Sequence, residues 1–240
     1  MDAQSLSYQK SSFQEENFMS RLIFEANPSQ AVPMSKYMKD QFPFLGIPKP
    51  IRAQLAKELM KESRGWTGAK LREEVFHYYQ QSEREYQYLA IDLFNKNVLR
   101  LELSELKSYL PLVAKKEWWD SIDAWRKGFN DYVKAYPDKL PEVFNWFFQA
   151  EDFWFRRISI NLQLQSKAAT NLALLEQAIL NDRTTAEFFI QKAIGWSLRE
   201  YSKTDPFYVT DFIAKNDLSK LATREGSKYL KKIKENQAES

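Results

Sequence analysis

Apolar side chains recur along this chain every three or four residues, in one short segment after another. This spacing places them on one side of an α-helix, which takes 3.6 residues per turn. No segment sustains the alternation of apolar and polar residues that is typical of a strand, and 6 glycines in 240 residues leave few hairpin turns. The pattern therefore predicts an all-α fold.

The predicted helices follow one another with short connections. Residues 1–16 are polar and are predicted to form a disordered leader, and residues 17–236 are predicted to form a single domain. The predicted helices cover residues 18–27, 31–41, a segment beginning at 51, 70–79, 83–97, 103–114, 117–136, 140–149, 152–164, 170–180, 186–202, 206–215 and 218–234. Because no single helix dominates, we expect antiparallel helix pairs stacked into a repeat-like solenoid rather than a closed bundle.

Composition narrows the possible chemistry. The chain has no cysteine and a single histidine, His77, which excludes disulfides, Cys-ligated metals and His-rich zinc sites, so we expect neither a metal nor a cofactor. The polar N-terminus and the lack of a long apolar run predict a soluble, cytoplasmic protein without a membrane partner. A net charge of +3 is too small to indicate a nucleic-acid partner by itself, so the distribution of the charges is decisive.

Residues 118–125 combine three tryptophans and two aspartates without a helix breaker. On a helix, Trp118 falls on the apolar stripe, whereas Trp119 and Asp123 lie four residues apart on a neighbouring face. A carboxylate held beside an indole at the edge of a core suits the stabilisation of positive charge. The alternative is a solvated helix acid next to an ordinary packing residue.

Two predicted helices carry rows of cations. In the first, an indole lies within the row, which consists of Lys192, Trp196, Arg199 and Lys203. Such a row suits a phosphate backbone with a sugar beside it, although Lys and Arg stems covering a surface tryptophan would give the same pattern. The second row follows the last predicted helix and consists of Lys220, Arg224, Lys228 and Lys231.

Arg157 occupies an unusual position for a cation. It shares a predicted helix face with the apolar residues Phe153 and Ile160. An arginine in such surroundings needs an anion. Its partner is either an acid on a neighbouring helix or a phosphate group, and the sequence leaves both open.

Together these segments resemble the AlkD family of DNA alkylation repair glycosylases. The resemblance rests on residues 33–39 (PMSKYMK), 44–47 (FLGI) with Pro50, 118–123 (WWDSID), Arg156 with Arg157, and 188–201. It implies a right-handed superhelical solenoid of HEAT-like repeats whose concave, positive surface holds duplex DNA. It also implies excision of cationic N3- or N7-alkylated purines, such as 3-methyladenine and 7-methylguanine, in base excision repair without base flipping.

The resemblance also implies roles for individual residues. Trp119, Asp123 and Trp196 are expected to surround the deoxyribose of the lesion, with Asp123 as the catalytic carboxylate. The expected DNA contacts are Arg157, Tyr37, Lys192, Arg199, Lys203, Lys49 and Arg52. We expect a monomer whose partner is double-stranded DNA with alkylated bases. Two alternatives are a non-catalytic binder of DNA structures and a helical-repeat scaffold whose groove holds an acidic peptide.

Overall fold

The computed structural model describes residues 21–238, and within this range the regular elements are helical. The α-helices are α1 (Pro28–Tyr37), α2 (Lys49–Leu55), α3 (Lys57–Glu62), α4 (Gly68–Gln80), α5 (Arg84–Asn97), α6 (Leu103–Lys107), α7 (Leu110–Val113), α8 (Trp119–Ala135), α9 (Leu140–Phe148), α10 (Phe153–Asn161), α11 (Leu172–Asp182), α12 (Phe188–Tyr201), α13 (Pro206–Lys215), α14 (Lys220–Gly226) and α15 (Lys228–Ala238). The all-α prediction is confirmed. The predicted leader, residues 1–16, lies outside the described residues.

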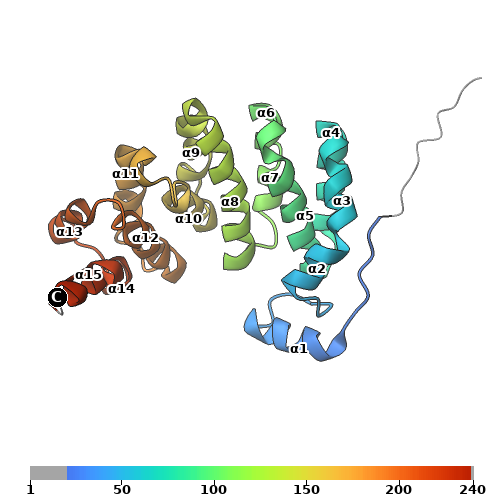
Figure 1. The fold of residues 1–240 in the computed structure, drawn as a ribbon, viewed down its shortest axis with the longest axis horizontal. Helices are drawn as coiled ribbons and strands as arrows, with labels where there is room; N and C mark the ends of the chain where they lie inside the picture. The colour runs from blue at the N-terminus through green and yellow to red at the C-terminus, as the bar shows by residue number, and fades with distance from the viewer. Residues whose placement is uncertain (1–20, 239–240) are drawn as a thin grey trace, which may run out of the picture.

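The helices form pairs that follow one another along an arc (Figure 1). Helices α5, α8, α10, α12 and α14 each contact the next in that order, and we call them the inner row. Figure 1 shows α1 at one end of the arc and α14 with α15 at the other, both on its lower side. The arrangement is a helical-repeat fold, as the stacking of amphipathic pairs predicts.

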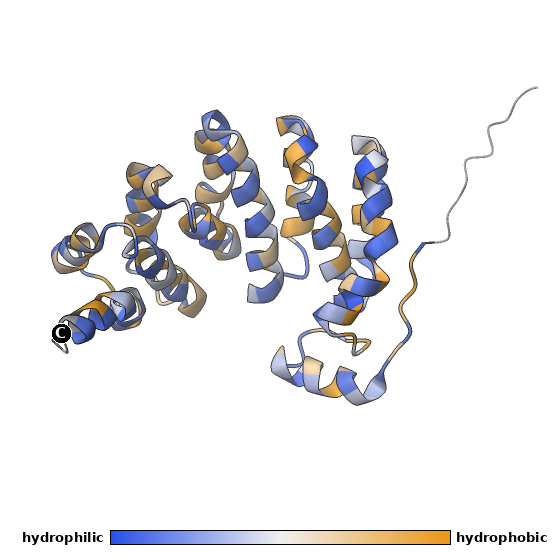
Figure 2. Ribbon diagram, viewed as in Figure 1, coloured by the Kyte–Doolittle hydropathy of each residue, from blue (hydrophilic) through white to orange (hydrophobic). Residues whose placement is uncertain are grey.

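The pairs are held together by one continuous apolar core. Hydrophobic and hydrophilic positions alternate around the helices, as Figure 2 shows. Trp125 of α8 is fully buried and lies 4.9 Å from Phe94 of α5, measured between ring centroids. Its indole Nε1 donates to the hydroxyl of Tyr79 at 3.3 Å. Burial of each such side chain contributes about 1.5–3 kcal/mol, so this stripe fixes which face of α8 remains outside the core.

The segment before α1 differs from the prediction. Residues 21–27 are not helical, so the predicted helix over 18–27 is wrong there, and residues 18–20 lie outside the described range. The backbone N–H groups of Leu22 and Phe24 donate to the hydroxyls of Tyr78 and Tyr86 at 2.8 and 3.0 Å. These donors are satisfied by side chains of α4 and α5, so the segment is held against these helices without forming a helix of its own.

Three predicted helices are interrupted, and the one that begins at residue 51 divides into α2 and α3 at Ala56. The helix predicted over residues 103–114 divides into α6 and α7, because Pro111 has no N–H to continue the hydrogen bonding and is accommodated at the start of α7. The helix predicted over residues 218–234 divides into α14 and α15 after Gly226, a weak helix former. Trp118, placed on the apolar stripe by the sequence pattern, has an extended backbone and precedes α8.

A buried carboxylate fixes the loop between α1 and α2. Glu85 accepts hydrogen bonds from the backbone N–H groups of Leu45, Gly46 and Ile47 at 2.9, 2.8 and 3.0 Å. Gly46 has a φ of 88°, and a Cβ there would lie 2.1 Å from the carbonyl oxygen of Asn27. Only glycine fits this approach, and the loop thereby holds α1 beside the inner row.

Candidate functional site

Trp119 and Asp123 lie in the first two turns of α8, on the face that points away from the core. Trp119 is the first residue of the helix, and Asp123 lies one turn later. Both side chains are partly exposed, whereas Ile122 between them is fully buried. The ring of Tyr37, at the end of α1, lies 6.0 Å from that of Trp119 in an edge-to-face arrangement. Tyr37 is 70% exposed, so this end of the inner row presents two aromatic rings to solvent.

Asp123 and Arg157 form a two-pronged ion pair between α8 and α10. Nε of Arg157 donates to Oδ1 of Asp123 at 3.0 Å, and NH2 donates to Oδ2 at 2.9 Å. The remaining nitrogen, NH1, donates to the carbonyl oxygen of Phe189 in α12 at 2.6 Å. Of the two partners that the sequence left open for Arg157, the structure shows the internal acid.

The ion pair leaves one side of Asp123 accessible. The side chain of Asp123 is 22% exposed, against 6% for Arg157. Each carboxylate oxygen accepts one hydrogen bond from Arg157 and retains further lone-pair capacity for a water or a ligand. Arg157 therefore fixes the orientation of a carboxylate that still faces outward.

Trp196 of α12 contributes the second indole. It is partly exposed, and the guanidinium carbon of Arg126 lies 5.8 Å from its ring centroid. Arg126 belongs to α8, three residues after Asp123 and therefore on the same side of the helix. Burial lowers the pKa of the Arg126 guanidinium, and the charge of Asp123 opposes that change. Arg126 was not among the residues predicted from the sequence, although its spacing of three residues from Asp123 places both on one helix face.

The two predicted basic rows meet at one buried acid, Glu225. Its carboxylate lies 3.3 Å from Nζ of Lys192 and 3.6 Å from NH1 of Arg199, both in α12. Arg224 and Lys228 approach the same carboxylate at 3.8 and 2.6 Å. The hydrogen bond from Lys228 is the main cause of the lowered pKa of Glu225. Four cations thus share one negative charge, and we call these five residues the Glu225 cluster.

The close approach of α12 and α14 makes this cluster possible. A Cβ on Gly195 would lie 2.4 Å from the Cβ of Glu225 and 3.0 Å from the carbonyl oxygen of Ala222. Glycine therefore lets α14 pack directly on α12 and carry Glu225 between the cations. The cluster gives this end of the inner row a net positive charge.

Comparison with known proteins identifies the family. The family model described as "DNA alkylation repair enzyme" matches residues 18–230. The chain belongs to this family. Among solved structures, it is similar to a predicted DNA alkylation repair enzyme from Enterococcus faecalis, at 55% identity over 87% of this chain and 98% of that one, with a TM-score of 0.86. AlkD2 from Streptococcus mutans shares the fold at 20% identity over 75% of this chain and 98% of that one, with a TM-score of 0.56. None of the curated proteins compared with the chain matches it.

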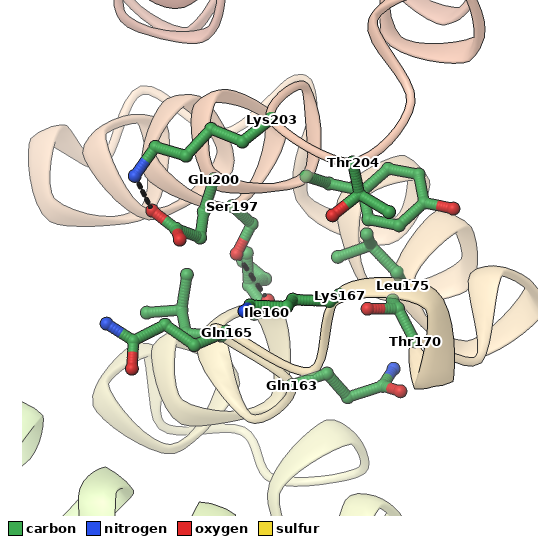
Figure 3. A pocket seen from close by; sticks show the side chains of 12 residues that line it. Ile160, Gln163, Gln165, Lys167, Thr170, Leu175, Ser197, Glu200, Lys203 and Thr204 are labelled. Carbon is green, nitrogen blue, oxygen red and sulfur yellow. Dashed lines mark hydrogen bonds and ion pairs between the residues drawn. The ribbon is translucent and has the colours of Figure 1, made fainter.

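Lys203 does not continue the basic row of this DNA alkylation repair family member. Helix α12 ends at Tyr201, and Lys203 lies after its end. Nζ of Lys203 pairs with Oε2 of Glu200 at 2.6 Å. Both residues line a cavity of about 230 Å³ between the C-terminal ends of α10 and α12, together with Lys167 (Figure 3). The predicted row therefore ends at Arg199, because Lys203 lies beyond the last helical turn.

The two cations predicted near α2 differ in accessibility. Lys49 is exposed and stays a predicted DNA contact. Arg52 is buried, lies 4.7 Å above the ring of Tyr88 and pairs with Asp92 at 3.5 Å. Its predicted contact with DNA does not fit the structure, because the side chain is buried between α2 and α5 and engaged by residues of α5.

Asp120, the other aspartate of the tryptophan-rich segment, is structural. It accepts hydrogen bonds from Nε and NH2 of the fully buried Arg84 at 2.9 and 2.7 Å, and from the hydroxyl of Tyr88 at 2.6 Å. The guanidinium of Arg84 also lies 3.8 Å above the ring of Phe42. This network joins the loop before α2 to the start of α8, and it leaves Asp123 as the outward-facing aspartate of the segment.

Two carboxyl groups, those of Glu117 and Asp152, interact near the start of α8, and this pair was not predicted. Burial raises the pKa of Glu117 to about 8, and a hydrogen bond with Asp152, the N-cap of α10, adds to the rise. Glu117 is therefore largely protonated at neutral pH. It therefore adds little negative charge near the start of α8.

Within residues 21–238, no group of three or more acidic or histidine side chains is arranged to hold a metal ion. In the same part of the chain, no helix combines the length and apolar character needed to cross a membrane.

Proposed function

We propose that this family member is a DNA glycosylase that excises cationic N3- and N7-alkylated purines, such as 3-methyladenine and 7-methylguanine, from duplex DNA. The observation that carries the proposal is Asp123, held in a fixed orientation by Arg157 yet partly exposed. Trp119 lies one turn before Asp123 on α8, and Trp196 lies on α12, two helices further along the inner row. The excision belongs to base excision repair and proceeds without flipping the base.

The chemistry needs a carboxylate but no strong acid. A purine alkylated at N3 or N7 already carries a positive charge, so it leaves with the electrons of the C1′–N bond without being protonated. The sugar then develops positive charge, which Asp123 stabilises while a water adds to C1′ and loses a proton. The indole faces of Trp119 and Trp196 contribute cation–π attraction of about 0.5–2 kcal/mol each. Neutral lesions are consequently poor substrates.

The direct test is release of free base. The protein is incubated with duplex DNA containing N7-methylguanine, and the released base is separated by chromatography and compared with a protein-free control. Free 7-methylguanine is the expected product. Duplex binding without release of the base would favour the non-catalytic DNA binder. Duplex binding that depends little on salt concentration would favour a scaffold for acidic peptides.

The Glu225 cluster is expected to supply sequence-independent affinity. The single variants Lys192→Gln and Arg199→Gln should each weaken binding of every duplex alike, because contacts to phosphates do not distinguish between base sequences. Each lost phosphate contact should lower the slope of log K against log salt by about one unit. Fluorescence anisotropy across several salt concentrations measures both effects.

Lys203→Gln is the matched control for this prediction, because it removes the same charge beyond the end of α12, where Lys203 pairs with Glu200. It should change the slope less than either cluster variant. A loss of affinity confined to one duplex sequence, or an equal effect of Lys203→Gln, would contradict the assignment of the cluster to the DNA backbone.

A further inference from the structure

Among the arginines that the structure describes on the inner row, Arg126 is the one with no carboxylate within ion-pair distance. Its Nε is buried and makes no hydrogen bond. Among the described residues, the recorded contact of its guanidinium is with Trp196, whose ring centroid lies 5.8 Å from the guanidinium carbon. That distance lies near the outer limit of about 6 Å for a cation–π contact, and a ring face does not satisfy a buried N–H. The buried Nε–H group of this guanidinium is thus unsatisfied.

The acids near Arg126 are already occupied. Asp123, one turn before it, has both oxygens bonded to Arg157. Asp131, on the following turns of α8, pairs with the neighbouring Lys127. A guanidinium remains protonated at any physiological pH, so Arg126 retains its charge in this partly desolvated position. Such a charge is costly unless a bound anion compensates it.

The charges around Arg126 favour an anion. Asp123 and Arg157 form a neutral pair, so the positive charge of Arg126 is not cancelled on the side that faces Trp196. The planar fork of an arginine matches two oxygens of one phosphate group. A phosphate bound there would lie beside the indole of Trp196, where the proposed mechanism needs the deoxyribose.

We propose that Arg126 binds a backbone phosphate next to the lesion nucleotide. It would thereby make the contact that the family resemblance assigns to Arg157. The inference rests on the proposed function, since it takes the sugar beside Trp196 to be that of the damaged nucleotide. Arg157 is then a positioning residue for Asp123, and Arg126 holds the strand.

The test compares Arg126→Gln with Lys127→Gln in duplex binding measured by anisotropy at several salt concentrations. Loss of a charge-assisted contact should weaken binding by Arg126→Gln about tenfold or more at low salt. The slope of log K against log salt should fall by about one unit. Lys127→Gln removes an equal charge from an exposed neighbour and should have a smaller effect on both quantities.

Thermal unfolding separates a binding role from a structural one. Because no acid pairs directly with Arg126, Arg126→Gln should leave the melting temperature unchanged or raise it. Arg126→Lys retains the charge, so it should preserve the salt slope while losing part of the affinity. A lower melting temperature with unchanged binding by Arg126→Gln would overturn the inference in favour of a structural role.

The parent protein distinguishes failure of the inference from failure of the proposed function. A parent that releases 7-methylguanine, with Arg126→Gln equal to it in affinity and salt slope, overturns only the phosphate contact. A parent that binds the duplex and releases no base overturns the glycosylase proposal, whereas the comparison of the two variants still tests the contact. A parent that binds no duplex overturns both.

Discussion

Asp123→Asn is expected to slow the excision of 7-methylguanine by about 10²- to 10³-fold in single-turnover measurements. The substitution preserves the size of the side chain but removes its charge. Loss of one preoriented electrostatic group costs about 3–4 kcal/mol of transition-state stabilisation, which corresponds to this factor. The affinity for uncleaved lesion DNA should stay the same or rise slightly, because the charge matters most when the sugar is positive and a negative charge near phosphates has been removed.

The matched control is Asp131→Asn, which makes the same change on the same helix. Asp131 pairs with the exposed Lys127, so its variant should excise at nearly the parent rate. Asp120→Asn would be unsuitable, because Asp120 holds the buried Arg84 and its loss would disturb the start of α8. If Asp123→Asn excises within about threefold of the parent, the carboxylate is not catalytic, since that factor is under 1 kcal/mol.

The helices were predictable because their signal is local. An apolar residue every three or four positions fixes which face of each helix is buried, and Ile122 and Trp125 of α8 confirm this. The interruptions at Pro111 and Gly226 also had local signals, which the periodic pattern obscured. Residues 21–27 were not predictable in this way, because the tyrosine hydroxyls that hold Leu22 and Phe24 lie 56 and 62 residues away in the chain.

The partners of the charged residues required the packing of the helices. A helical wheel shows that Arg157 needs an anion, but the approach of α8 and α10 decides that the anion is Asp123. The same holds for Arg52, whose acid is Asp92 on α5. Conversely, no pattern within α8 shows that Arg126 lacks a partner, because that depends on how Arg157 and Lys127 occupy the nearby acids.

Arg157→Ala is expected to destabilise the protein by about 3 kcal/mol and to slow excision as well. The loss of stability follows from removing one partner of an ion pair whose arginine is 6% exposed. For a chain of this size, about 1 kcal/mol lowers the melting temperature by about 2–4 °C, so calorimetry should show a drop of several degrees. Excision should slow because Asp123 loses the fork that orients it toward the sugar, even where the protein is still folded.

Arg156→Ala separates the two effects. Arg156 is also part of an internal ion pair, with Asp182 at 3.0 Å, and it binds the carbonyl oxygen of Ala150 at 3.1 Å. Its loss should lower the melting temperature to a similar extent but leave excision close to the parent rate at a temperature where both variants are folded. If Arg157→Ala instead keeps the parent melting temperature and binds duplex DNA more weakly, its anion in solution is a phosphate. Asp123 would then be unpaired when DNA is bound, and the phosphate contact assigned to Arg126 would have to be shared with Arg157.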